Sequence, residues 1–183
     1  MSANFIFSPT SLDGVVRIEP KQFSDTRGSF TETYSAPQFA EAGITDSFIQ
    51  DDLSFSREGV LRGLHFASHP HETAKLVRCV EGEAFDVVVD LRVGSRTFGK
   101  HESFELSGEN GLILYVPRGF AHGFCALSDV LMAYKITDIY RPECDAGIRY
   151  DDPELGIAWP CREFVLSDKD KGLPSFKQYA EQR

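Results

Sequence analysis

Cysteine is scarce in this 183-residue chain, and its spacing gives no sign of pairing. The four cysteines stand at positions 79, 125, 144 and 161, and no two of them form a Cys-x-x-Cys motif. This pattern excludes the disulfide framework of a small secreted domain and the paired thiolates of a zinc knuckle. Cys79 lies in an apolar strand pattern, so we interpret it as a small buried hydrophobic residue.

Positive charge is also in short supply. The chain has 28 acidic against 19 basic side chains, which gives a formal net charge of −9. This balance excludes a general electrostatic attraction to nucleic acid or to an anionic membrane, because both require a basic surface. A small anionic ligand remains compatible with the composition, since a local cluster of arginine and lysine outweighs the global sign.

Long apolar runs are missing as well. Residues 1–20 contain no basic region followed by an apolar stretch, and no segment approaches the length that crosses a membrane. We therefore expect a cytoplasmic protein. The length suits one domain with a substantial core, so we predict a single domain over residues 1–183.

The sequence has little helical signal and many short strand patterns. Ser35–Gly43 is the clearest helix, because Ser35 suits the N-cap and Pro37 the first turn. The turn at 81–83 is predicted to join two strands as a hairpin, and loops and short turns are expected from residue 140, with a helical or frayed end at 176–183. We expect strands near 15–20, 30–34, 48–55, 61–66, 75–80, 85–91, 102–106, 112–116 and 130–137. This pattern predicts an all-β sandwich or barrel, most simply a jelly roll, with short peripheral helices.

The stretch Gly59–Lys75 carries the strongest chemical signal. It places His65 and Lys75 beside apolar residues, on two strands joined by the polar loop 67–74. A neutral imidazole near a fixed ammonium suits proton removal from carbon, because the base stays unprotonated and a cation is available for the oxyanion. The alternative interpretation is a core histidine bonded to a backbone carbonyl.

Arg62 and His65 have opposite parity, so a regular strand would direct their side chains to opposite faces. Gly63 is a position at which a β-bulge would re-aim one of the two. The alternative is that the two side chains lie at different depths of one site.

Three sets of side chains fall at predicted strand ends, where the mouth of a barrel would gather them. Clustered cations would bind phosphate oxygens and paired aromatics would stack on a nucleobase, although a solvated charge or a core ring is the simpler interpretation of each residue alone. Imidazole, phenol and carboxyl groups would transfer protons. The cations are Arg27, Arg62, Lys75 and Lys169; the aromatics are Phe23, Phe30, Tyr134 and Tyr140; the proton carriers are His65, His122, Tyr134 and Asp170.

A metal-binding pattern competes with this interpretation. Gly63-x5-His69-x-His71 has the spacing of a metal cupin, and Gly111-x5-Pro117-x-Gly-x2-His122 matches its second half. The glutamate expected three or four residues after His71 is missing, and an iron or zinc site would need that carboxylate. The sequence therefore favours a site without metal and leaves a metal-dependent cupin as an alternative.

The assembled motifs resemble the dTDP-4-dehydrorhamnose 3,5-epimerase family from about Phe23 to Pro174. The resemblance implies a cupin-type jelly-roll barrel, no metal or organic cofactor, and a homodimer with N-terminal strand exchange between the two sites. It rests on Phe23-x-Asp-x-Arg-Gly-x-Phe-x-Glu32, Gly59-Val-Leu-Arg-Gly-Leu-His65, Lys75-Leu-Val77, Phe85-Asp-Val87, Val89-Asp-Leu-Arg-x-Gly-Ser95, Pro117-x-Gly-Phe-Ala-His-Gly-Phe124, Tyr134-Lys135, Asp152-Pro153, Trp159-Pro160 and Leu166-Ser-x-Lys-Asp170.

The resemblance also implies residue roles. His65 corresponds to the base, Asp170 to the carboxylate that orients it, and Tyr134 to the acid on the opposite face. Lys75 would stabilise charge on the C4 oxygen of a nucleotide-linked 4-keto-6-deoxyhexose, most simply dTDP-4-dehydro-6-deoxyglucose in dTDP-rhamnose biosynthesis. Substrate contacts are implied for Phe23, Arg27, Glu32, Gln50, Asp51, Asp52, Arg62, His122, Tyr140, Asp145 and Lys169, with Phe23 and Tyr140 enclosing the base.

The chain departs from the family pattern near the sugar. Ala67, Ser68 and Thr73 stand in a region that usually carries glutamines, and Asp52 and Asp145 replace other residues. These departures keep alternatives open: inversion at C3 only or C5 only, and a dTDP-, CDP- or GDP-linked keto sugar. A non-catalytic sugar-nucleotide binding module is the alternative of another class.

Overall fold

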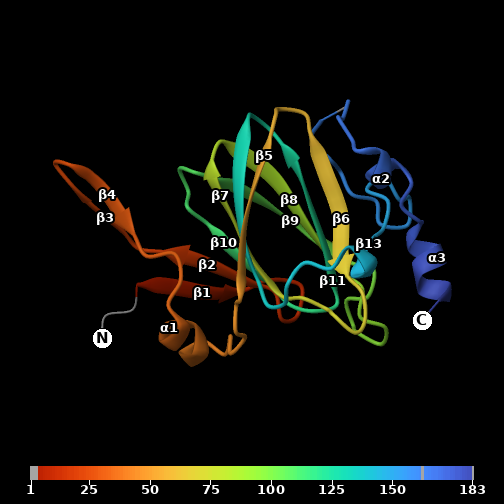
Figure 1. The fold of residues 1–183 in the computed structure, drawn as a ribbon, viewed down its shortest axis with the longest axis horizontal. Helices are drawn as coiled ribbons and strands as arrows, with labels where there is room; N and C mark the ends of the chain where they lie inside the picture. Colours follow the sequence, from red (N-terminus) through yellow and green to blue (C-terminus); the bar gives the residue numbers. More distant parts are fainter. Residues whose placement is uncertain (1–3, 162, 183) are drawn as a thin grey trace.

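Two antiparallel sheets face each other and enclose the main core, as the computed structural model of residues 4–161 and 163–182 shows (Figure 1). The six-stranded sheet has the order β1 (Phe5–Pro9), β2 (Val16–Pro20), β10 (Ile113–Val116), β7 (Lys75–Glu81), β12 (Val130–Ile136) and β5 (Gln50–Ser56). The five-stranded sheet has the order β13 (Asp145–Gly147), β6 (Leu61–Ala67), β11 (Phe120–Ala126), β8 (Glu83–Asp90) and β9 (His101–Ser107). The predicted all-β jelly-roll fold is confirmed.

Strand β11 shows how the sheets are buried. Its alternate residues Phe120 and Phe124 point into the core between the sheets, where they meet Leu114 and Met132. Ala121, between them, faces a second apolar cluster outside the five-stranded sheet. All seven residues of β11 are therefore buried, which is the pattern of a strand covered on both faces.

The predicted hairpin around residues 81–83 is wrong. Strand β7 pairs with β10 and β12, whereas β8 pairs with β11 and β9, so the chain crosses here from one sheet to the other. Cys79 from β7 and Val88 from β8 then meet in the core from opposite sides. The turn residues are typical of a hairpin. The two strands nevertheless lie in opposite sheets, because there the apolar face of each strand packs against the other in the core, which pairing side by side in one sheet would not achieve.

A β-bulge in β6 confirms the prediction made for Gly63. His65 pairs with His122 and Arg62 with Phe124, so the two residues Gly63 and Leu64 oppose Gly123 alone. Gly63 has φ +131°, and a Cβ at this position would lie 2.6 Å from the Cα of Gly123. The bulge requires glycine here, and it allows Arg62 and His65 to line the same cavity.

The first helix covers the outer face of the six-stranded sheet. Helix α1 (Ala36–Glu41) lies within the predicted range, and Gly43 follows with φ +89°. The Ser35 side chain makes no capping hydrogen bond. Phe39 is fully buried in a cluster with Phe5 of β1, a strand that the sequence analysis did not predict.

The chain after β12 covers the outer face of the five-stranded sheet. Ile148, Leu155 and Phe176 pack there against Leu64 and Val87. The predicted loops and short turns are confirmed, and the helical alternative predicted within 176–183 is observed over Phe176–Glu181. The elements are the 3-10 helix η1 (Pro142–Cys144), β13, α2 (Asp168–Lys171) and α3 (Phe176–Glu181). None of the helices described in residues 4–161 and 163–182 is long and apolar enough to cross a membrane.

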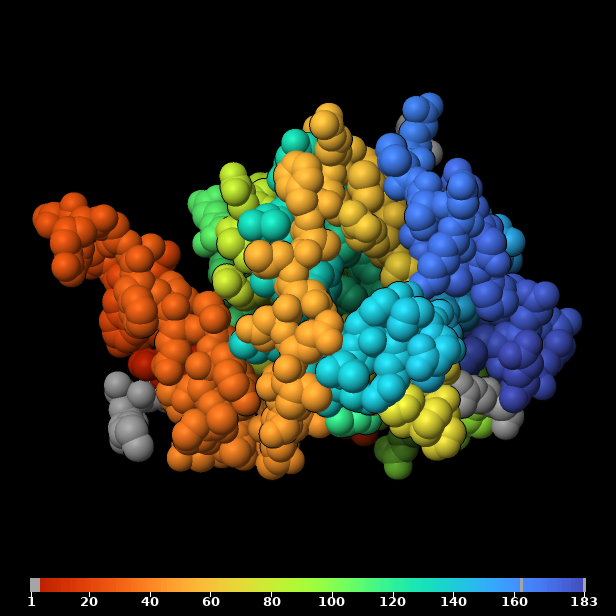
Figure 2. Space-filling model, in the orientation of Figure 1, coloured from red at the N-terminus to blue at the C-terminus, as the bar shows by residue number. Residues whose placement is uncertain are grey.

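A separate hairpin projects from the body of the molecule (Figures 1 and 2). It consists of β3 (Gln22–Asp25) and β4 (Gly28–Thr31), which pair only with each other among the strands that the structure describes. The turn predicted at residues 25–28 is present, while β4 begins and ends earlier than the strand expected at 30–34. Phe23 and Phe30 are 41% and 69% exposed, so this hairpin presents two aromatic rings to its surroundings.

Candidate active site

A cavity of about 290 Å³ opens between the two sheets. Side chains from both sheets line it, because inward-facing positions of β5, β6, β7, β11 and β12 converge there. In the space-filling view its mouth lies beside the orange strand β5, above the cyan segment that follows β12 (Figure 2). His65 is on β6 and Lys75 is on β7, so the two side chains come from opposite sheets rather than from neighbouring strands of one sheet.

His65 is held by a carboxylate from the C-terminal segment. Its Nε2 lies 2.5 Å from Oδ1 of Asp170, a residue in the first turn of α2. The Ser167 hydroxyl caps this turn by accepting a hydrogen bond from the Asp170 amide at 3.1 Å. Burial alone would raise the pKa of Asp170, but the bonds from His65 and Ser167 bring it below its ordinary value. An ionised Asp170 fixes the orientation of the imidazole and can stabilise the imidazolium that forms after a proton is taken up.

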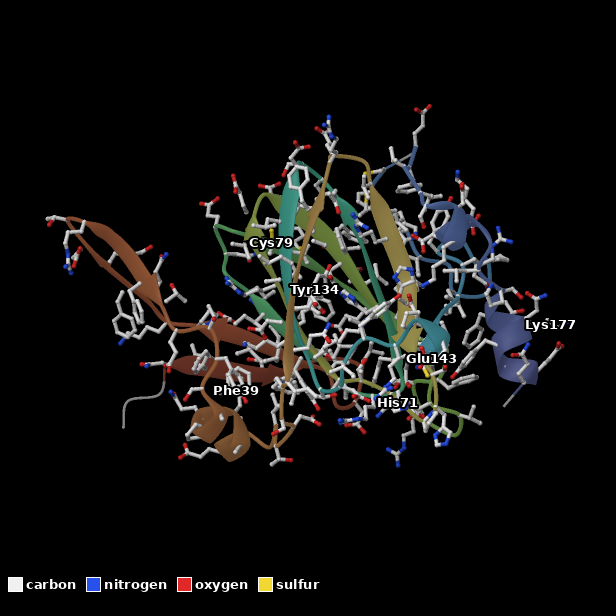
Figure 3. The ribbon with its side chains drawn as sticks, in the orientation of Figure 1. Phe39, His71, Cys79, Tyr134, Glu143 and Lys177 are labelled. Atoms are coloured by element: carbon white, nitrogen blue, oxygen red, sulfur yellow. The ribbon has the colours of Figure 1, made fainter. Side chains whose placement is uncertain are left out.

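Tyr134 supplies a phenol to the same cavity from β12 (Figure 3). Its hydroxyl lies 3.2 Å from Oγ of Ser54 on the neighbouring strand β5. Desolvation raises the pKa of Tyr134, and the nearby negative charge of Asp86 adds to this effect. The phenol thus keeps its proton across the ordinary pH range and is suited to donate it.

Lys75 lies at the start of β7, on the sheet that carries Tyr134. Desolvation lowers the pKa of its ammonium group, while the carboxylates of Asp145 and Asp86 act in the opposite direction. A cation in a site partly shielded from water interacts strongly with a developing oxyanion.

A second histidine–carboxylate pair lies beneath the cavity. His122 Nε2 is 2.7 Å from Oδ2 of Asp86, and both residues are almost fully buried. Oδ1 of Asp86 has no hydrogen-bond partner within residues 4–161 and 163–182. The sequence analysis proposed His122 but gave Asp86 no role. An acidic residue between the core-facing Ala84 and Val88 of β8 was the signal that it missed.

Other predicted binding residues gather at the outer part of the cavity. Arg62 donates to Ser56 Oγ at 2.8 Å and to the Phe55 carbonyl at 3.1 Å. The Tyr140 hydroxyl donates to Asp145 Oδ2 at 2.9 Å, and Lys169 forms an ion pair with the same carboxylate. Gln50 lies behind this group, accepting from the Tyr140 amide at 2.9 Å and donating to Asp52 at 2.9 Å. The lining residues in this set are Asp52, Arg62, Tyr140 and Asp145.

Six predicted binding residues do not line the cavity of their own chain. Gln50 and Lys169 contact residues that line it, whereas the other four lie away from it. Phe23 and Arg27 lie on the projecting hairpin, where Arg27 pairs with Asp25. Glu32 accepts from Asn4 at 2.9 Å. Asp51 lies on the outer face of the six-stranded sheet and pairs with Lys135 at 2.8 Å.

The histidines of the competing metal pattern do not converge. The His69 side chain is 77% exposed, and His71 directs Nδ1 to Asp138 at 2.7 Å. His122 is bonded to Asp86 instead. Across the part of the chain that the structure describes, no three His, Cys, Asp or Glu side chains are placed to hold a metal ion. Arg141, which the sequence analysis did not single out, lines the cavity near His71.

A jelly roll whose interior gathers a carboxylate-bound histidine, a protonated tyrosine and a lysine defines an enzyme that transfers protons to and from carbon. The family model for dTDP-4-dehydrorhamnose 3,5-epimerase matches residues 9–178. The chain belongs to this family, and it is an epimerase, a member of the isomerases.

Similar proteins agree with this assignment. A dTDP-4-dehydrorhamnose 3,5-epimerase of Methanothermobacter thermautotrophicus is 48% identical over 180 residues, which cover 96% of this chain and 97% of that protein. The crystal structure of a 3,5-epimerase from Legionella pneumophila in complex with dTDP-4-keto-L-rhamnose superposes with a TM-score of 0.91 at 45% identity, covering 94% and 93% of the two chains. A dTDP-4-dehydrorhamnose 3-epimerase of Streptomyces niveus is 43% identical over 165 residues, covering 89% and 80%.

Proposed function

We propose that this enzyme inverts C3 and C5 of dTDP-4-dehydro-6-deoxyglucose to give dTDP-4-dehydrorhamnose. The observation that carries the proposal is that His65, which is bonded to Asp170, and Tyr134 line one cavity from opposite sheets. Both carbons are α to the C4 ketone, so one base reaches an enolate on either side. A donor on the other face then returns the proton with inverted configuration.

Each step has a residue suited to it. His65 removes the proton from C3 or C5, and Asp170 stabilises the imidazolium that forms. Lys75 stabilises the negative charge on the C4 oxygen, with the His122–Asp86 pair beside it. Tyr134 delivers a proton from the opposite face. The substrate's own ketone acidifies the carbon, so the proposed mechanism uses no metal and no organic cofactor.

The rest of the substrate is assigned to the outer part of the cavity. We propose that Arg62 and Lys169 contact the diphosphate and that Tyr140 covers one face of the base. Phe23 and Arg27 are proposed to act in the site of a second subunit, because their hairpin projects away from its own body. We thus propose a cytoplasmic homodimer of single-domain subunits with exchange of the N-terminal hairpin.

The proposal is tested by NMR of dTDP-4-keto-6-deoxyglucose incubated with the enzyme in D₂O. Deuterium is expected at both C3 and C5, because each inversion replaces a carbon-bound proton with one from solvent. Absence of exchange at both centres, by folded enzyme and with several 4-keto sugar nucleotides, would overturn the proposal.

A second candidate is inversion at C3 alone. The 3-epimerase of Streptomyces niveus is nearly as similar to this chain as the 3,5-epimerases are. Both reactions need the same base and acid. They differ in whether the base and acid also act on the second carbon, C5, after C3 has been inverted. Label confined to C3 in the D₂O experiment would select this candidate.

A further inference from the structure

Two cysteines that are distant in sequence meet on the outer side of the five-stranded sheet. Sγ of Cys125 lies 3.1 Å from Sγ of Cys161. Cys125 is on β11 and fully buried, whereas Cys161 is partly exposed in the segment between β13 and α2. Both are free thiols in the structure.

Cys161 is held in place by contacts on both sides. Before it, the indole of Trp159 donates to the Tyr150 carbonyl at 2.9 Å. After it, Val165 exchanges backbone hydrogen bonds with Gly59 and Leu61 at 2.9 Å and 3.1 Å. The thiols are thus kept together by the fold, which raises the effective concentration of each at the other.

The geometry points to a dithiol site at Cys125 and Cys161 that reacts with a low-molecular-weight disulfide and forms a reversible internal disulfide. This inference goes beyond the epimerase activity and does not depend on it. In a reducing compartment the pair remains a dithiol, and the bond forms when small disulfides accumulate.

The reaction proceeds in two exchange steps. Cys161 gives up its proton, and its thiolate attacks one sulfur of the small disulfide, which releases one small thiol and leaves a mixed disulfide. Cys125 then gives up its proton and displaces the second small thiol, closing the bond to Cys161. The protein loses two protons and two electrons, and the small disulfide gains them as it becomes two thiols. Burial raises the pKa of Cys125, so the more exposed Cys161 is the attacking thiol.

The bond would tie β11 to the segment that leads to Asp170. Because the sulfurs are already in contact, closure needs no large movement of that segment. We therefore expect the oxidised enzyme to keep its epimerase activity. Closing a loop of this length is expected to raise the melting temperature by roughly 5–15 °C.

The test is intact mass spectrometry of the purified enzyme before and after incubation with oxidised glutathione. The wild type is expected to lose two hydrogen atoms, reversibly with dithiothreitol, and peptide mapping is expected to link Cys125 to Cys161. Cys125→Ala is expected to stop at a glutathione adduct on Cys161, and Cys161→Ala to remain unmodified at Cys125. Cys79→Ala, which alters a buried cysteine outside the pair, is the control and is expected to behave as the wild type.

Two results would overturn the inference. One is a wild type that stays a dithiol, or keeps a stable glutathione adduct, under conditions that oxidise a reference dithiol. The other is a disulfide that maps to a different pair. Because Cys161 is partly exposed, Cys161→Ala keeps the test valid even if the Cys125 variant does not fold. A fall in activity on oxidation would contradict the expectation that the bond forms without displacing Asp170.

Discussion

At the scale of single residues, Tyr134 and His65 are expected to perform separable steps. Without the phenol, His65 still removes a proton and returns one to the same face, so exchange continues while inversion stops. We expect Tyr134→Phe to lower the rate of epimer formation by about 10²–10⁴-fold and to lower deuterium uptake by less. NMR in D₂O measures both quantities in one sample.

Ser54→Ala is the matched control for this variant, because it removes the hydrogen-bond partner of the phenol and leaves the phenol itself. A small effect is expected from it. Equal loss of exchange and inversion in Tyr134→Phe would show that the two steps depend on the same group, which contradicts the assigned roles.

The buried carboxylate of Asp86 is expected to control the pH range of activity through Lys75. Lys75 must be protonated to stabilise the oxyanion, so activity falls as the pH rises through its pKa. Desolvation already lowers that pKa, and the charge of Asp86 raises it. Asp86→Asn removes the opposing charge, so the alkaline limb of kcat/KM is expected to move to lower pH.

The pH profile of kcat/KM for Asp86→Asn checks this prediction against two other variants. Asp145→Asn is expected to move the alkaline limb in the same direction, because Asp145 also raises the pKa of Lys75. Asp51→Asn, on the outer face of the sheet, is expected to leave it in place. If the alkaline limb of kcat/KM stays at the same pH in both the Asp86 and the Asp145 variants, the role assigned to Lys75 is contradicted.

At the scale of elements, the connection from β8 to β9 is held by a buried carboxylate. Asp90 accepts from Arg92 at 2.7 Å and 2.9 Å, from Ser95 at 2.6 Å and from Thr97 at 2.6 Å. Burial opposes its ionisation, but these bonds lower the pKa of Asp90 to about 2. Because the folded pKa lies below the unfolded value, this stabilisation is present above about pH 4 and is lost as the pH falls towards 2.

We expect Asp90→Asn to lower the free energy of unfolding by at least about 2 kcal/mol near pH 7. The difference from the wild type is expected to shrink between about pH 4 and pH 2, where the wild type loses the same charge. Urea unfolding at several pH values measures it. Asp13→Asn, an exposed carboxylate nearby, is the control, and a wild-type-like Asp90→Asn would show that the network adds no stability.

At the scale of the whole molecule, the projecting hairpin predicts that two subunits share each site. Two variants test this prediction. The first, His65→Asn, removes the base and leaves the hairpin intact. In the other, Arg27→Ala damages the hairpin and leaves the base intact. If the hairpin acts in the partner's site, a mixed dimer regains one complete site, and random mixing of the two inactive variants restores about a quarter of the activity.

Co-expression of the two variants with different purification tags, followed by assay of each dimer species, measures this effect. If the hairpin acts in its own subunit, every site of the mixed dimer carries one lesion and no activity returns. Light scattering that shows a monomer at assay concentrations would also contradict subunit sharing. A mixture of His65→Asn with Asp170→Asn, two lesions of the same body, is the control without complementation.

The sequence by itself determined the features that depend on neighbours along the chain. Alternating apolar residues placed most strands, Pro37 and Gly43 bounded α1, and Gly63 marked the bulge because only glycine tolerates that conformation and the contact with Gly123. The motifs around His65 and Asp170 resembled those of a known family, and that resemblance predicted a proton-transfer set before any distance was known. The fold brings His65 and Asp170 into contact beside the cavity that His65 lines.

Only the tertiary structure decided which strands face each other. Periodicity tells which side of a strand is apolar but not which sheet it joins, so β7 and β8 looked like a hairpin and lie in opposite sheets. For the same reason the Asp86–His122 pair and the contact of Cys125 with Cys161 were not foreseen, because 36 positions separate each pair in sequence. Such contacts arise from long-range packing, which the local pattern of residues does not encode.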